Sequence, residues 1–205
     1  MLGSMSMLKW QPVAVAYALL GSLAAGLAVA LRDGSPFSHP APWLTLEEPV
    51  RAGSSLLLGV ALAVVLVAST RIAVQRWSWA RRLHADLRPV ARDLTAPSVL
   101  IIAILSSLGE ELFFRGFLTP LVGVVAQAAL FGVAHQVRGP SRWVWVAWAC
   151  LVGLCLGAIF KLTGSLIGPI AAHAIVNAYN LRFLRDHDPA PKERRLGGLF
   201  APSDV

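Results

Sequence analysis

The chain has 205 residues, of which 56% are hydrophobic and only 14% charged, with a formal net charge of +7 and a mean hydropathy of +0.64. Soluble domains carry about 25% charged residues. The composition therefore excludes a water-soluble enzyme, a disordered chain and a nucleic-acid-binding protein, and its length suits one domain in a lipid bilayer.

Six apolar stretches approach the ~20 residues that a helix needs to cross the hydrocarbon core. They run from 13 to 31, 53 to 70, 98 to 121, 124 to 137, 143 to 162 and 166 to 181. We therefore predict an all-α, polytopic bundle of about six transmembrane helices. The first stretch ends near an Ala-x-Ala site, as a signal peptide does. It is longer than a signal core of about 7–15 residues, which favours a retained helix.

The basic residues indicate how the helices are oriented. With six spans and the N-terminus inside, 14 of the 18 Lys and Arg residues fall on cytoplasmic segments, as the positive-inside rule requires. We expect both termini in the cytoplasm. The preference for Arg over Lys, with much Ala, Gly and Pro, is typical of a GC-rich bacterial genome. The expected location is thus the cytoplasmic (inner) membrane of a bacterium.

The segment from 71 to 96 mixes arginines with Trp and Leu, which predicts an amphipathic helix at the cytoplasmic interface. Pro89 should break or kink that helix. Residues 1–97 would then comprise two transmembrane helices and this interfacial helix, and residues 182–205 a disordered cytoplasmic tail. Three histidines outside the spans are expected to be solvated: His39, His84 and His187.

Two adjacent carboxylates lie within the third apolar stretch. Ionisable residues inside a membrane are costly and usually functional. Glu111 and Arg115 are four residues apart, so they share a helix face and can pair. Glu110 points elsewhere, and its own helix offers no basic residue to neutralise it. Such a carboxylate is suited to act as a general base.

The fourth and sixth stretches carry the remaining buried polar candidates. His135 ends the fourth stretch, and His173 and Asn177 lie one turn apart on the sixth. Glu110 and His135 are level in the membrane only if the chain reverses near Gly123, a residue that suits a tight reversal. The distances to Arg138 and Arg182 place the site in the cytoplasmic half of the membrane.

The ordered motifs Glu110-Glu111-x-x-x-Arg115, Phe131-x-x-x-His135 and His173-x-x-x-Asn177 resemble those of the CPBP family, the CAAX proteases and bacteriocin-processing proteins, also called Abi. Its eukaryotic members are the type II CAAX prenyl endopeptidases. The resemblance covers residues 98–181 and implies a catalytic core of transmembrane helices there. It implies hydrolysis of a peptide bond in a membrane-associated protein or peptide.

The resemblance also implies residue roles. Glu110 would activate water with the help of His135, while His173 and Asn177 would stabilise the oxyanion. Three residues would support this geometry: Glu111, Arg115 and Phe131. No cofactor is favoured, because Asn is a poor zinc ligand and no His-Glu-x-x-His is present. Zn²⁺ held by Glu110, His135 and His173 is the metal-dependent alternative.

Two other functions use the same features. A catalytically silent membrane scaffold or immunity protein would keep the fold without the chemistry, and an ion or proton carrier would also need buried Glu and His. The partners expected for the protease are the lipid bilayer and a membrane protein or peptide substrate, with no nucleic acid. The sequence does not indicate an oligomeric state.

Overall fold

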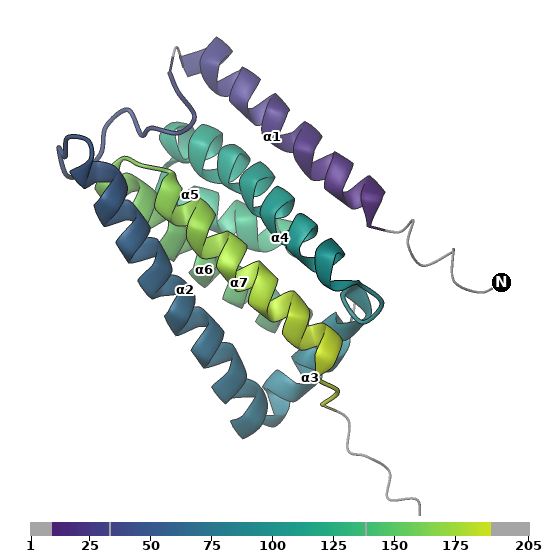
Figure 1. Ribbon diagram of the computed structural model, residues 1–205. Coiled ribbons are helices and arrows are strands. Elements are labelled where there is room, and N and C mark those ends of the chain that lie inside the picture. Colours follow the sequence, from purple (N-terminus) through teal and green to yellow (C-terminus); the bar gives the residue numbers. More distant parts are fainter. Residues whose placement is uncertain (1–9, 33, 138, 190–205) are drawn as a thin grey trace, which may run out of the picture.

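The computed structural model describes residues 10–32, 34–137 and 139–189 (Figure 1). These ranges are all-α, as predicted, and their only extended pairing is an isolated bridge between Ser38 and Ser165. The α-helices are α1 (Gln11–Arg32), α2 (Val50–Arg76), α3 (Ser78–Leu87), α4 (Ala96–Glu110), α5 (Thr119–Ala134), α6 (Arg142–Thr163) and α7 (Ile167–Asp186). A 3₁₀ turn, η1 (Arg88–Val90), follows α3, and a π-helix, η2 (Glu111–Leu118), joins α4 to α5.

The helices form two layers. α1, α4, α7 and α2 lie side by side in that order, each packed on the next, and α5 and α6 pack together behind them (Figure 1). α4 and α7 are therefore central, which is where the polar motifs lie. The backbones of α2 and α7 are in close contact, since a Cβ atom on Gly59 would clash with the carbonyl oxygen of Gly168.

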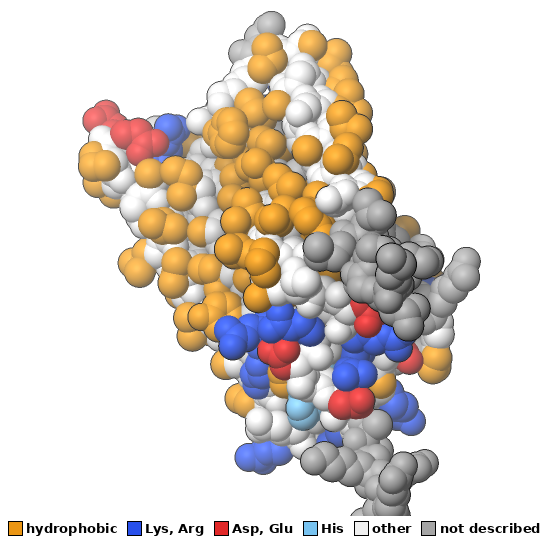
Figure 2. Space-filling view, turned by 45° about the vertical axis from the view of Figure 1, so that its right-hand side comes forward, with side chains coloured by type: hydrophobic (Ala, Val, Ile, Leu, Met, Phe, Trp, Pro, Cys, Tyr) orange, Lys and Arg blue, Asp and Glu red, His pale blue; other side chains and the backbone are white. Residues whose placement is uncertain are grey.

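The outer surface suits a bilayer. Large apolar side chains face outward, among them Leu57, Val64 and Val125, which are 71%, 63% and 72% exposed. Figure 2 shows a broad apolar face, with most of the visible basic and acidic side chains gathered toward one end. Exposing such a surface to water is unfavourable, whereas lipid tails solvate it.

Four segments are long and apolar enough to cross a membrane: α1, α2, Ala96–Ala134 and α6. The third holds two of the predicted stretches, joined at Gly123, whose φ of 81° and ψ of 168° are not helical. The chain turns back around this glycine, since the side chains of Thr119 and Gln127 on either side are hydrogen-bonded at 3.3 Å. The reversal predicted at Gly123 is confirmed; the six-span count and the orientation stay predictions.

The predicted interfacial helix differs in its bounds. Residues 71–76 continue α2, and the extended backbone at Trp77, with φ −121° and ψ 134°, separates them from α3. α3 then ends before the turn that contains Pro89, as expected of a residue that cannot continue a helix. The indoles of Trp77 and Trp79 stack at 5.8 Å.

The exposure of His84 and His39 was predicted wrongly. His84 is 4% exposed, with Nε2 hydrogen-bonded to the carbonyl oxygen of His187 at 3.0 Å and its ring edge-on to Phe183. His39 is 7% exposed, and its Nδ1 accepts the N–H of Ala41. Burial lowers the pKa of both imidazoles, that of His39 to about 4. His187 is exposed, as predicted.

The C-terminal segment is also more ordered than predicted at its start. α7 continues to Asp186, so residues 182–186 are helical and not part of a disordered tail. Arg71 of α2 holds this end of α7: its guanidinium donates to Asn180 Oδ1 and the Tyr179 carbonyl, and lies 3.8 Å from the centroid of the Phe183 ring. The remainder of the predicted tail, from 190 onward, lies outside the described residues.

Candidate active site

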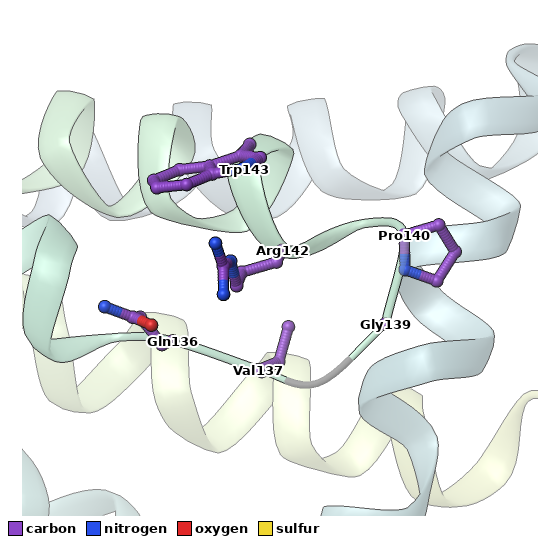
Figure 3. Close-up of a pocket in the computed structure, with 6 residues that line it drawn as sticks. All are labelled: Gln136, Val137, Gly139, Pro140, Arg142 and Trp143. Carbon is purple, nitrogen blue, oxygen red and sulfur yellow. The ribbon is translucent and has the colours of Figure 1, made fainter.

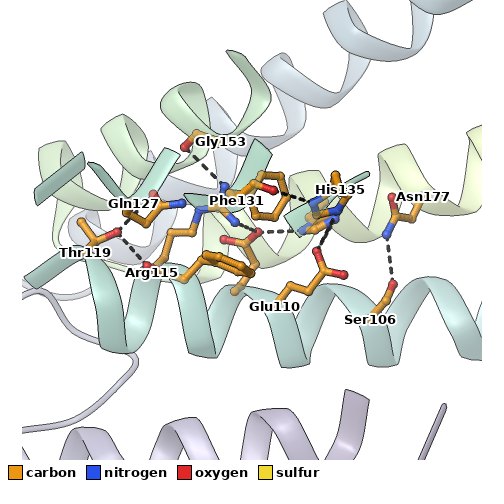
Figure 4. Close-up of polar contacts among 12 residues, drawn as sticks. Ser106, Glu110, Arg115, Thr119, Gln127, Phe131, His135, Gly153 and Asn177 are labelled. Carbon is orange, nitrogen blue, oxygen red and sulfur yellow. Dashed lines mark hydrogen bonds and ion pairs between the residues drawn. The ribbon is translucent and has the colours of Figure 1, made fainter. Parts of the chain in front are cut away.

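The polar motifs meet inside the helix bundle (Figure 4). α4 carries Glu110 at its last turn, and η2 begins at the next residue, Glu111. His135 is the C-terminal cap of α5, and His173 lies on α7. The three segments that sequence reasoning singled out therefore bring their side chains to one place. We describe two parts of this cluster, a closed half and an open half.

The closed half comprises Glu111, Arg115 and the carbonyl of Gly153. Glu111 and Arg115 have no exposed side-chain area, and they pair at 2.8 Å between Oε1 and Nη1, as predicted. Arg115 Nη2 donates to the Gly153 carbonyl at 3.3 Å, and its guanidinium carbon lies 4.3 Å from the centroid of the Phe131 ring. A carboxylate and a guanidinium thus cancel each other's charge where water cannot reach.

Glu111 also orients His173. Oε1 of Glu111 lies 2.7 Å from Nδ1 of His173. A carboxylate can only accept a hydrogen bond, so Nδ1 carries the proton and Nε2 is the free nitrogen of the neutral ring. Nε2 faces Glu110, at 3.8 Å from Oε2. Glu111 therefore determines that Glu110 faces the unprotonated nitrogen of His173.

The open half comprises Glu110, His135, Nε2 of His173, and Asn177. His135 Nε2 lies 3.4 Å from Oε2 of Glu110, and its Nδ1 donates to the Phe131 carbonyl at 2.8 Å. Phe131 packs against the imidazole of His135, with ring centroids 4.2 Å apart. The His135 side chain is 23% exposed, whereas that of Glu110 is 8% exposed. This half therefore reaches the surface at His135.

Asn177 joins the cluster through a residue that the sequence reasoning missed. Its Nδ2 donates to Ser106 Oγ at 3.0 Å, and Ser106 is buried one helical turn before Glu110. The sequence could have indicated Ser106, because it lies four residues before Glu110 and its hydroxyl is therefore on the same face of α4. A second missed residue is Tyr17 of α1, whose phenol group lies beside the Glu110 carboxylate.

The Glu-Glu-x-x-x-Arg motif does not lie on an α-helix throughout. Residues Glu111–Leu118 form a π-helix, which the four-residue spacing did not predict. At its end, Thr119 Oγ1 donates to the Phe114 carbonyl at 2.9 Å, which satisfies a backbone oxygen in the wider turn. π-helical segments occur frequently at functional sites because they re-aim side chains that a regular helix would direct elsewhere.

Two hollows adjoin the exposed end of the site. One, of about 670 Å³, lies directly after His135 between the loop to α6 and the first turn of α6; it is lined by Gln136, Val137, Gly139, Pro140, Arg142 and Trp143 (Figure 3). The other, of about 720 Å³, is an apolar cavity between α2, α3, α6 and α7. Trp143 lines both, and the Trp145 ring lies 6.2 Å from that of His135.

The metal-dependent alternative places Zn²⁺ between Glu110, His135 and His173. A zinc site needs at least three donors about 2.0–2.3 Å from one ion, and no group of three or more His, Cys, Asp or Glu side chains in the described ranges fits one. The Nε2 atoms of His135 and His173 lie 3.4 and 3.8 Å from Oε2 of Glu110. Asn177 is engaged with Ser106.

Comparison with known proteins agrees with the motifs. Residues 92–179 match the family described as type II CAAX prenyl endopeptidase Rce1-like. The chain is also 27% identical over 123 residues to the uncharacterized protein YpbD of Bacillus subtilis strain 168. That match covers 58% of this chain and 64% of YpbD. No solved structure matches the chain. The family match includes both halves of the site and leaves α1, α2 and α3 outside it.

Proposed function

Because residues 92–179 belong to the Rce1-like family of type II CAAX prenyl endopeptidases, we propose that this protein is an integral-membrane endopeptidase. It hydrolyses a peptide bond in a membrane-associated protein or peptide. The lipid bilayer and that substrate are its partners.

The observation that carries the proposal is the difference between two neighbouring carboxylates. Glu111 is neutralised by Arg115 at 2.8 Å. Glu110 faces the Nε2 atoms of His135 and His173 at 3.4 and 3.8 Å, and its Oε2 is buried without a hydrogen-bond partner among the described residues. A buried, unpaired oxygen costs free energy. A carboxylate held so beside two imidazoles is suited to accept and pass on a proton.

The reaction follows from this geometry. Glu110, assisted by His135, takes a proton from a water molecule as the water oxygen attacks the carbonyl carbon of the scissile bond. Negative charge develops on the carbonyl oxygen, where the Asn177 amide donates a hydrogen bond. His173, whose Nε2 is unprotonated in the neutral ring, donates there once Glu110 has passed it the proton taken from water. The carbon–nitrogen bond then breaks, and the proton taken from water passes to the leaving nitrogen. No electrons are exchanged with a cofactor in this sequence.

The proposed mechanism is of the glutamate type and does not route a step through a metal. If the enzyme instead needs zinc, purified protein will contain stoichiometric zinc that is lost together with activity on chelation. Under the proposal, cleavage in washed membranes continues after incubation with a chelator. Restoration of lost cleavage by added zinc would contradict the glutamate mechanism.

We place the site in the cytoplasmic half of a bacterial inner membrane. The charged side chains that follow α3 and α7 lie together, as the salt bridge between Arg88 of η1 and Asp188 at 3.1 Å indicates. Positive segments of this kind stay on the cytoplasmic side. A reporter fused after Val205 will therefore be active in the cytoplasm, and a periplasmic signal would contradict this orientation.

The test of the proposed function compares membrane proteins from cells that carry the wild type or Glu110→Gln. Proteins that remain uncut will accumulate with Glu110→Gln, because amide nitrogen cannot act as the base. Glu47→Gln is the matched control, since Glu47 is an exposed glutamate in the loop before α2. Identical membrane proteomes at equal levels of inserted protein would overturn the endopeptidase.

A further inference from the structure

α1 lies outside the segment that matches the family, yet it contacts the site at close range. A Cβ atom on Gly109 would clash with the Tyr17 carbonyl oxygen, and one on Gly21 would lie 3.2 Å from the Gly109 Cα. The backbones of α1 and α4 therefore touch at the residue that directly precedes Glu110. This close approach is what small residues permit between membrane helices.

The side chain of Tyr17 uses this approach to reach the open half. It is partly buried, and its phenol group lies beside the Glu110 carboxylate. A carboxylate can only accept, so the hydroxyl is the donor in a hydrogen bond between them. The chain has only one other tyrosine, Tyr179, which is 57% exposed and whose backbone carbonyl accepts from Arg71.

Among the described residues, the other groups beside Glu110 in the open half are the imidazoles of His135 and His173. Arg115 is committed to Glu111 and Gly153. The two imidazoles are 3.4 and 3.8 Å from Oε2, which is longer than an ordinary hydrogen bond. Without a further contact, the Glu110 carboxylate could rotate away from both rings. A hydrogen bond from a neutral donor to a carboxylate is strong and directional, so it would hold the carboxylate without cancelling its charge.

We propose that Tyr17 is a positioning residue for Glu110, donating its phenol hydrogen to the carboxylate and holding it toward His135 and His173. The role in catalysis rests on the proposed function, whereas the contact itself does not. α1 thereby becomes part of the active enzyme. An arginine or lysine in this place would neutralise the base; a phenol orients the carboxylate and leaves its charge intact.

The first test measures the contact without any substrate. Purified protein in phosphatidylethanolamine–phosphatidylglycerol vesicles gives an infrared spectrum, and subtraction of the Glu110→Gln spectrum isolates the Glu110 carboxyl band. Tyr17→Phe, measured against Tyr17→Phe/Glu110→Gln, will shift that band. Tyr179→Phe, treated in the same way, will leave it unchanged. An unshifted band in folded Tyr17→Phe protein would overturn the proposal.

The second test measures the consequence for cleavage. Pulse–chase of a membrane protein that accumulates uncut with Glu110→Gln will show cleavage about ten- to hundredfold slower with Tyr17→Phe, the range expected for one hydrogen bond to a charged group. KM for that protein, measured in vesicles, will stay within about twofold, because Tyr17 does not contact substrate. A shifted band with wild-type cleavage by Tyr17→Phe would overturn the positioning role. If Glu110→Gln itself cuts normally, the proposed function has failed while the band still reports the contact.

Discussion

The closed and open halves of the site contain adjacent glutamates that meet very different surroundings. Glu111 has no exposed area and is paired with Arg115, which is equally buried. Glu110 has no ion pair with a Lys or Arg of the described residues, and it faces imidazoles at the end of the cluster where His135 is 23% exposed. Charge cancellation makes a carboxylate structural, whereas incomplete pairing beside an accessible imidazole leaves it chemically available.

The largest effect expected from this difference is on catalysis. Glu110→Gln will lower the cleavage rate by about 10²–10⁴-fold, the usual contribution of a general base. The variant will insert and unfold as the wild type does, because Gln has the same shape as Glu and its amide oxygen can still accept the hydrogen bond proposed for Tyr17. Pulse–chase and thermal unfolding check the two parts; a loss of inserted protein would show that Glu110 is structural as well.

The next effect is on stability and lies in the closed half. Arg115→Met will destabilise the protein by about 3–5 kcal/mol, because it leaves the carboxylate of Glu111 buried without its partner. Arg115→Met combined with Glu111→Leu will recover part of this loss, since replacing both charges removes the uncompensated one. Unfolding midpoints in one detergent give the comparison. A double variant less stable than Arg115→Met would contradict charge pairing as the cause.

A smaller effect is expected from Ser106→Ala. Ser106 Oγ accepts from Asn177 Nδ2 at 3.0 Å and so orients the amide proposed to stabilise the oxyanion. Its loss will slow cleavage about tenfold, less than the 10²–10³-fold expected for Asn177→Ala, which removes the donor itself. Ser69→Ala is the control, because Ser69 bonds only within its own helix, to Leu66. Equal losses for Ser106→Ala and Ser69→Ala would exclude the positioning role.

The smallest effect concerns a buried histidine without a carboxylate partner. The pKa of His39 is about 4 instead of 6.5, because burial disfavours its charged form, as do Lys161 and Arg32. Between pH 6.5 and 4 the unfolded chain therefore binds a proton that the folded chain does not, and stability falls as the pH is lowered. The unfolding midpoint will fall by a few degrees across this window, and less in His39→Gln. His187→Gln, at an exposed position, will keep the wild-type slope.

The spacing of residues along the chain correctly predicted those parts of the site that depend on residues close together in the sequence. The pairing of Glu111 with Arg115 follows from four residues on one helix face, and the reversal at Gly123 from a glycine midway between two apolar stretches. His84 and His39 were misplaced for the opposite reason. His84 is covered by the ring of Phe183 and His39 by the ring of Phe160, and both phenylalanines lie on helices far away in the sequence. The residues next to the two histidines therefore gave no sign of their burial.

By itself the sequence determined the membrane class, the all-α fold and the residues of the three motifs, since composition, helical periodicity and short-range spacing are local properties of the chain. The tertiary structure alone decided which nitrogen of His173 faces Glu110, that the motif runs through a π-helix, and that Tyr17 reaches the site. Those outcomes depend on how closely helices approach one another. At Gly21 and Gly109 the distance between α1 and α4 is limited by contact between the two backbones. The hydrophobic periodicity of the sequence does not predict that contact.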